Sequence, residues 1–280
     1  MVRWEGRRQS RNIEDRRGIG AGPKIGGIGA VVLLVVGALL GIDPRALLQF
    51  AEGPSTGAEP YEETAEERES ADFTSVILAD TEETWQRLFQ QRGSEYREPT
   101  LVLFTGSVRT GCGSASAITG PFYCPLDEKV YIDLSFYDEL TNRLGAGGDF
   151  AHAYVIAHEV GHHVQNLMGT LGAVQSGKAG VSRTEANALS VRVELQADCF
   201  AGVWGHHAER ARDLLEPGDV EEGLGAAAAI GDDRLQSQTQ GRVVPESFTH
   251  GSSDQRVRWF RTGLETGDIG ACDTFTGPTS

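Results

Sequence analysis

The segment that most constrains this chain is residues 150–168, FAHAYVIAHEVGHHVQNLM, which carries two histidines four positions apart. Its apolar residues recur at steps of three and four, and this spacing predicts an amphipathic helix; they are Phe150, Tyr154, Val155, Ala157, Val160, Val164 and Leu167. On a helix, His158 and His162 lie on one face one turn apart, so both imidazoles can bind a single metal ion. Zn²⁺ binds neutral imidazole nitrogen well.

Glu159 follows the first of these histidines and points about 100° around the helix from it. A carboxylate in that position lies beside the metal, where it can take a proton from a bound water. The H-E-x-x-H pattern therefore predicts a zinc site with a general base. The alternative is a helix whose two histidines face solvent, and the apolar periodicity of the segment argues against it.

A second helix supplies candidates for the remaining ligand. A catalytic zinc held by two histidines needs a third protein ligand and an open position for water. Residues 183–215 read as a long helix, on which Glu194 and Asp198 lie one turn apart on one face. We assign Glu194 to the metal and Asp198 to the far nitrogen of a ligand histidine, whose tautomer it would fix. Glu185 is a rival third ligand, but no acidic residue follows it one turn on.

The N-terminal part of the chain combines a basic head with an uncharged apolar run. The formal net charge of the chain is −15, but residues 1–24 carry +4 and the remainder carries −19. Residues 25–42 contain no charge and would span about 27 Å as a helix, close to the hydrocarbon thickness of a bilayer. We therefore expect one uncleaved transmembrane helix, with the head in the cytoplasm and the acidic body outside.

Two alternatives exist for residues 25–42. A cleaved signal peptide is the first, but the head is long and no small-x-small cleavage site follows the run. A buried core helix is the second. Residues 43–72 are rich in acids and are broken by Gly and Pro, so we expect a disordered linker. An acidic body without clustered Lys and Arg argues against nucleic-acid binding.

Residues 73–280 are expected to form one α+β domain, mostly helical with a small β-sheet. Short apolar runs predict strands at 101–104 and 130–134, joined by a Gly- and Pro-rich loop. Besides the two helices above, periodic segments predict helices at 80–91, 136–144, 221–236 and 254–264. The Gly-rich residues 169–180 are expected to be a mobile loop.

The four cysteines allow two disulfides, because a domain outside the cytoplasm can keep them. Three connectivities are possible. Cys112 and Cys124 flank one compact loop, so we pair them, which leaves Cys199 with Cys272. A cysteine metal site is the rival interpretation, but the chain has no C-x-x-C.

His250 precedes the helix expected at 254–264, which Ser252 or Ser253 would cap. From that place a side chain can reach into a cleft and stabilise the oxyanion formed when water attacks a peptide carbonyl. The alternative is a satisfied surface histidine. We expect no role in the metal site for the other histidines, which are His152, His163, His206 and His207. We interpret Asp232 and Asp233 as a solvated or capping pair.

The two motifs and three further segments resemble the putative neutral zinc metallopeptidase family of bacterial envelopes, within the broad zincin group. The motifs are HEVGHHVQ and VELQADCFAG, and the further segments are RWEGRR at 3–8, GPFYCP at 120–125 and PESFTHGSSDQR at 245–256. The resemblance implies a zinc-peptidase fold with His158 and His162 as ligands and Glu159 as base. It also supports Glu194 as third ligand, by likeness to the E-x-x-x-D helix of thermolysin-like enzymes.

We therefore expect a single-pass cell-membrane protein whose extracytoplasmic zincin-like domain uses Zn²⁺ and Glu159 to hydrolyse peptides or proteins. The alternative is a catalytically silent zincin-fold module that binds or scaffolds an envelope partner. A structural zinc site would usually be closed by a fourth protein ligand, and the sequence offers no obvious one. Intramembrane proteolysis is excluded because the segment with the motif is too polar to span a bilayer.

Overall fold

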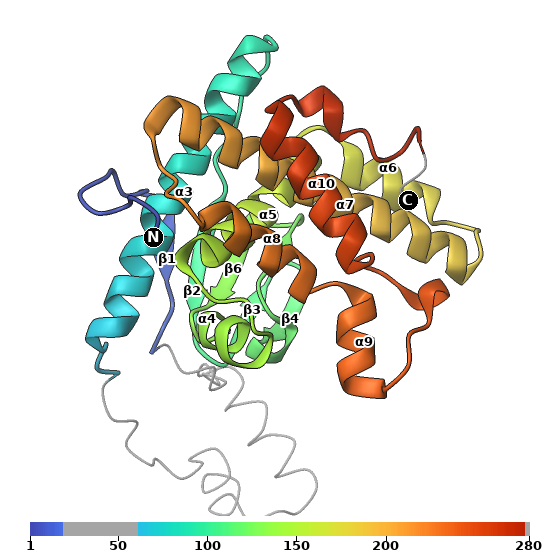
Figure 1. The fold of residues 1–280 in the computed structure, drawn as a ribbon, viewed down its shortest axis with the longest axis horizontal. Coiled ribbons are helices and arrows are strands. Elements are labelled where there is room, and N and C mark those ends of the chain that lie inside the picture. Colours follow the sequence, from blue (N-terminus) through green and yellow to red (C-terminus); the bar gives the residue numbers. More distant parts are fainter. Residues whose placement is uncertain (19–60, 278–280) are drawn as a thin grey trace, which may run out of the picture. The chain divides into compact units, whose positions relative to one another are not determined.

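The computed structural model describes residues 1–18 and 61–277. The chain divides into two units, of which the first combines Met1–Arg16 with Thr64–Ser280 and the second is Arg17–Glu63. In the second unit, the guanidinium of Arg17 pairs with the carboxylate of Glu63 at 2.7 Å. The first unit contains all the helices and strands described below (Figure 1).

A four-stranded mixed sheet has the order β1-β2-β6-β5. Its strands are β1 (Ile13–Asp15), β2 (Thr100–Phe104), β6 (Lys129–Asp133) and β5 (Phe122–Cys124). The first three run parallel, and β5 runs antiparallel to β6. β2 and β6 are the predicted apolar strands, and they are buried because the sheet lies in the interior. A separate hairpin joins β3 (Ser107–Thr110) to β4 (Gly113–Ser116).

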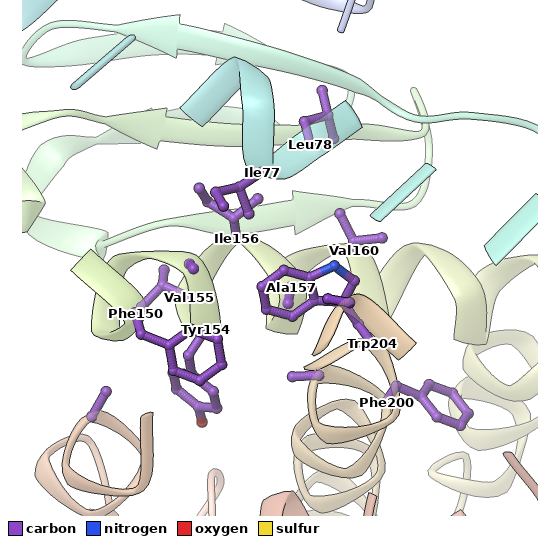
Figure 2. Packing of buried hydrophobic residues seen from close by; sticks show 14 of the residues in the cluster. Ile77, Leu78, Phe150, Tyr154, Val155, Ile156, Ala157, Val160, Phe200 and Trp204 are labelled. Atoms are coloured by element: carbon purple, nitrogen blue, oxygen red, sulfur yellow. The ribbon is translucent and has the colours of Figure 1, made fainter. Parts of the chain in front are cut away.

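The helix α5 (Asp149–Leu167) carries the H-E-x-x-H motif and lies at the centre of the core. It contacts α3 (Ala65–Gln91), β5, β6, α7 (Arg183–Arg212) and α8 (Asp219–Ala229). In Figure 2, Ile156 points toward Ile77 of α3, whereas Tyr154 points to the opposite side of α5. Because both sides of the helix are covered by apolar side chains, the backbone that carries the motif is held rigidly.

α7 packs against α10 (Ser253–Thr266) over a long interface, as Figure 1 shows. Two glycines permit the close approach. A Cβ at Gly202 would overlap the carbonyl oxygen of Phe260, and a Cβ at Gly263 would overlap that of Cys199. Within the described residues, the other α-helices are α4 (Ser135–Asp138), α6 (Thr170–Gly177) and α9 (Asp232–Gln240).

Both predicted disulfide pairings are present. Cys112 pairs with Cys124 and joins the β3–β4 hairpin to β5, and Cys199 pairs with Cys272 and joins α7 to the C-terminal segment. No free cysteine is found in the described residues. The longer closed loop, with a sequence separation of 73, restricts the unfolded chain more than the one with a separation of 12.

Several element boundaries differ from the sequence expectation. α3 begins at Ala65 because Thr64 and Glu67 form a capping box, so residues 65–72, which we assigned to the end of the linker, are helical. The segment expected as one helix at 136–144 is α4 followed by a π-helical turn, Glu139–Arg143. The Gly-rich residues expected as a loop contain α6. The helix expected at 221–236 is divided into α8 and α9 at Gly231, where an added Cβ would overlap Ser253.

We expected the N-terminal head to be a separate cytoplasmic segment. Instead, residues 1–16 fold with the rest of the first unit. Val2 is only 4% exposed and belongs to the main apolar core. The Arg3 amide donates to the carbonyl of Leu214 at 2.9 Å, and β1 pairs with β2. Two basic residues of this head, Arg3 and Arg8, pair with the carboxylates of Asp213 and Glu82 in the rest of the first unit.

The predicted transmembrane topology is also wrong for the structure described. Across residues 1–18 and 61–277, none of the helices is both long enough and apolar enough to cross a bilayer. The anchor expected at 25–42 and most of the linker expected at 43–72 lie outside the described residues. The fold is α+β and mostly helical with small sheets, as predicted, but the single-pass membrane localisation is contradicted.

Candidate metal centre

Three side chains from α5 and α7 converge on one point. The Nε2 of His158 lies 3.2 Å from Oε2 of Glu194, and the Nε2 of His162 lies 3.6 Å from the same oxygen. The three candidate ligand atoms all lie within 4.8 Å of one another. Two imidazoles one turn apart on one helix therefore face a carboxylate from another helix.

The spacing of these atoms fits a tetrahedral zinc ion. Zn–N and Zn–O bonds of about 2.0–2.1 Å place two tetrahedral ligand atoms about 3.3 Å apart. The distances from Glu194 to the two histidines, 3.2 and 3.6 Å, lie close to that value. In the part of the chain that the structure describes, the cluster comprises these three side chains and leaves one coordination position for water.

Asp198 orients His158 by bonding to Nδ1, the ring nitrogen that does not face the metal site. Its Oδ1 accepts a hydrogen bond from Nδ1 of His158 at 2.9 Å, and both of its oxygens accept from Arg256, at 2.8 and 2.9 Å. Burial opposes ionisation of Asp198, but the charge of Arg256 and the bond from His158 hold the pKa of this carboxyl below its ordinary value. Because an ionised carboxylate only accepts, Nδ1 of His158 carries the proton, and in the neutral ring Nε2 is the nitrogen that can bind a metal.

Gln165 orients the second histidine in the same way. Its Oε1 lies 2.9 Å from Nδ1 of His162, and its Nε2 donates to the carbonyl of Val193 on α7 at 2.7 Å. Since the amide nitrogen is committed to that carbonyl, the amide oxygen accepts from His162. Nε2 of His162 is then free as well, so the protein holds both rings in the tautomer that binds a metal.

Glu159 is buried beside the two histidines and lines the same cleft. Burial raises the pKa of Glu159 above its ordinary value, although the neighbouring histidines oppose the shift. A carboxylate with a raised pKa is a stronger base than an exposed one. The position and the environment of Glu159 therefore suit the removal of a proton from a water at the open coordination position.

We expect Asp198→Asn to weaken zinc binding about 10- to 100-fold, because the carboxylate that fixes the tautomer of His158 and balances Arg256 is lost. Competition with a chromophoric chelator measures the affinity. Asp254→Asn, on the exposed face of α10, is the matched control and should bind zinc like the original protein. If Asp198→Asn binds zinc with the same affinity as Asp254→Asn, the carboxylate of Asp198 does not support the metal site.

The metal cluster opens into a cleft of about 700 Å³. His250 lines this cleft together with the ligand residues, and its Nδ1 lies 3.2 Å from Oδ1 of Asp232. The other oxygen of Asp232 accepts from the backbone amides of Thr249, His250 and Gly251. Asp232 is therefore a buried anchor for the His250 loop and not the solvated or capping residue we had expected.

Comparison with known protein families shows to which family the chain belongs. The family model described as putative neutral zinc metallopeptidase matches residues 2–275. The chain belongs to this family. The resemblance identified from the motifs is thereby confirmed, and the family name implies zinc, for which His158, His162 and Glu194 are the candidate ligands.

Curated relatives align with most of the length of this metallopeptidase family member. The uncharacterized protein YpfJ of Escherichia coli strain K12 is 51% identical over 285 residues, covering 98% of this chain and 99% of the relative. The uncharacterized protein Rv2575 of Mycobacterium tuberculosis strain H37Rv is 43% identical over 252 residues, covering 85% and 84%. No solved structure matches the chain.

Other candidate residues of this family member bond to groups outside the metal cluster. Glu185 accepts from both the amide and the hydroxyl of Ser182 in the capping box of α7, so it is not part of the cluster. His206 and His207 contact the carbonyls of Leu264 and Gly267 at the end of α10.

The sequence interpretation missed three residues that support the ligands. Arg256 and Gln165 are described above, and Tyr154 donates its hydroxyl hydrogen to Asp198. Gln165 could have been found, because it follows His162 by three positions and therefore lies on the same helix face. Arg256 ends the segment PESFTHGSSDQR, but nothing local relates it to the metal site, since it lies on α10, 58 residues after the carboxylate that it pairs with.

Proposed function

We propose that this chain is a zinc-dependent peptidase in which Glu159 is the general base. The observation that carries the proposal is the convergence of His158, His162 and Glu194 on the wall of a cleft, with the buried carboxylate of Glu159 lining the same cleft. Zinc held there supplies Lewis acidity, which lowers the pKa of a water and polarises a carbonyl. An arrangement with three protein ligands and a neighbouring base suits hydrolysis better than a closed structural site.

Glu159 carries the proton through the reaction. It takes a proton from the attacking water, and the water oxygen forms a bond with the carbonyl carbon of the peptide. Glu159 then donates that proton to the amine nitrogen as the C–N bond breaks. Burial supports the first step because it raises the pKa of Glu159 above its ordinary value, which makes the carboxylate a better proton acceptor.

His250 is suited to stabilising the oxyanion. The hydrogen bond with Asp232 raises the pKa of His250 and favours a ring that donates from both nitrogens. The three amides that Asp232 accepts from fix the loop, and the half-exposed ring lines the cleft. A donor fixed in this way can bind the negative oxygen that forms during attack on a carbonyl.

The wall of the cleft suits an extended chain as substrate. β5 is the last strand of its sheet, and Phe122 and Tyr123 of this strand line the cleft beside the metal cluster. An extended peptide can pair with the free edge of a strand, so that main-chain hydrogen bonds provide affinity. Other cleft residues are mostly apolar, and they include Phe136, Leu144, Ile230 and Leu235.

Removal of the metal tests the function. The purified full chain, incubated with a library of fluorogenic peptides, should cleave some of them, and a phenanthroline chelator should abolish the cleavage. Addition of about one equivalent of Zn²⁺ should restore it, and the non-chelating isomer of phenanthroline should have no effect. Cleavage that survives metal removal would contradict the proposal. A zinc-loaded chain that cleaves no peptide would favour the alternative of a binding or scaffold module.

A further inference from the structure

His163 is a buried histidine on α5 that directly follows the ligand His162 but points away from the metal. Its ring is fully buried, and both of its nitrogens have partners. Nε2 lies 2.6 Å from the carbonyl oxygen of Arg97, and Nδ1 lies 3.0 Å from the hydroxyl of Tyr123. The ring therefore connects the motif helix both to the segment before β2 and to the strand β5.

These contacts fix the direction of each hydrogen bond. The carbonyl of Arg97 can only accept, so Nε2 of His163 carries the proton and Nδ1 is an acceptor in the neutral ring. The hydroxyl of Tyr123 therefore donates to Nδ1. The same hydroxyl accepts from the side-chain amide of Asn166, at 3.0 Å. Two residues of α5, one turn apart, thus hold Tyr123 in a single orientation.

Tyr123 joins β5 to α5 through its hydroxyl, which bonds to His163 and Asn166. Side chains alternate along a strand, and its neighbours face the other way. Phe122 stacks on Tyr131 of β6 at 4.9 Å between ring centroids, and Cys124 forms the disulfide with Cys112. The strand has only three residues and is paired with one neighbour, and its hydrogen bonds to α5 are those of the Tyr123 hydroxyl, so this contact helps to set its position against the helix.

We propose that His163 is a positioning residue that sets the width of the substrate cleft by holding Tyr123, and with it β5, against the helix that carries the metal ligands. The inference rests on the proposed peptidase function, because β5 matters here as the wall along which a peptide would lie. Loss of the contact leaves the three ligands and Glu159 in place but lets the wall move. Substrate binding should therefore suffer more than the chemical step.

Kinetic constants for a cleaved peptide test the proposal. Tyr123→Phe removes one hydroxyl and keeps the ring, and His163→Phe removes its acceptor. Each should raise KM roughly tenfold, the effect of losing one well-formed hydrogen bond, while kcat changes less than about twofold. The double variant should be no worse than the single ones, because both break the same contact. His152→Phe, a histidine of α5 that does not line the cleft, is the matched control and should leave KM unchanged.

Inhibitor binding separates a failure of this inference from a failure of the proposed function. A peptide hydroxamate and acetohydroxamate both bind zinc, but only the first lies along the wall. Tyr123→Phe should weaken the peptide hydroxamate roughly tenfold and leave acetohydroxamate unchanged, with the same zinc content as the original protein. Equal affinity for the peptide hydroxamate, or a fall in kcat with KM unchanged, would overturn the proposal. If His163→Phe does not fold, Tyr123→Phe decides the outcome alone.

Discussion

Replacing Glu159 with glutamine should lower kcat for peptide cleavage about a thousandfold and leave the zinc in place. The amide has nearly the same shape as the carboxylate but cannot take a proton from water. Residue 159 is not one of the three candidate ligands, so the substitution should leave the metal bound. The loss therefore separates the chemistry from the binding of the metal, which no substitution of a ligand can do.

The measurement is kcat for one cleaved peptide together with zinc content by mass spectrometry. Glu246→Gln, an exposed glutamate outside the cleft, is the control and should retain full activity. If Glu159→Gln keeps more than about a tenth of the original kcat with zinc bound, Glu159 is not the base.

Substituting Gly263 with alanine should destabilise the protein by about 3 kcal/mol or more and also impair the site. The new methyl group would overlap the backbone carbonyl of Cys199, and no side-chain rotation can relieve a backbone clash. α7 and α10 must then separate. Because Asp198 lies on α7 and Arg256 on α10, the pair behind His158 should be stretched and zinc affinity should fall.

Gly225→Ala is the matched control for this experiment. Gly225 lies on α8 with no atom within 4 Å of an added Cβ, so alanine should be neutral or stabilise the helix by up to about 1 kcal/mol. Denaturant unfolding of the two variants measures the difference. Equal stability of Gly263→Ala and Gly225→Ala would show that the close approach of the two helices is not required.

The metal cluster was the easiest part to predict because each half of it is local. His158 and His162 have the spacing of one helix face, and Glu194 and Asp198 have the same spacing on a second helix. Only the meeting of the two helices is non-local. The structure places all four side chains together, whereas the chemical roles assigned to them stay predictions until the variants are measured.

Contacts between distant segments were the hardest to predict. Ile13 of β1 pairs with Leu101 of β2, and a strand of three residues has too few positions to show an alternating pattern. The basic head and the apolar run that follows it are typical of a membrane anchor, so they suggested the wrong topology. The signals against that interpretation were the apolar residues within the head, of which Val2 is buried and Trp4 packs on the core.

The role of Asp232 was also missed for a physical reason. Acidic residues at the beginning of a helix usually cap it or interact with its dipole, so Asp232 and Asp233 appeared ordinary. In the structure, Asp232 accepts from a loop 17 to 19 residues further along the chain. Position in the sequence gives no sign that such a loop folds back onto Asp232, with His250 lining the cleft.

The zinc content of the purified chain tests the central claim most directly, when it is compared with that of Glu194→Ala after both are dialysed against the same chelator. We predict about one zinc per original chain and roughly a tenth of that or less in the variant, since two histidines alone hold the ion weakly. An original chain that retains no zinc, or a variant that retains as much as the original, would contradict the metal centre described here.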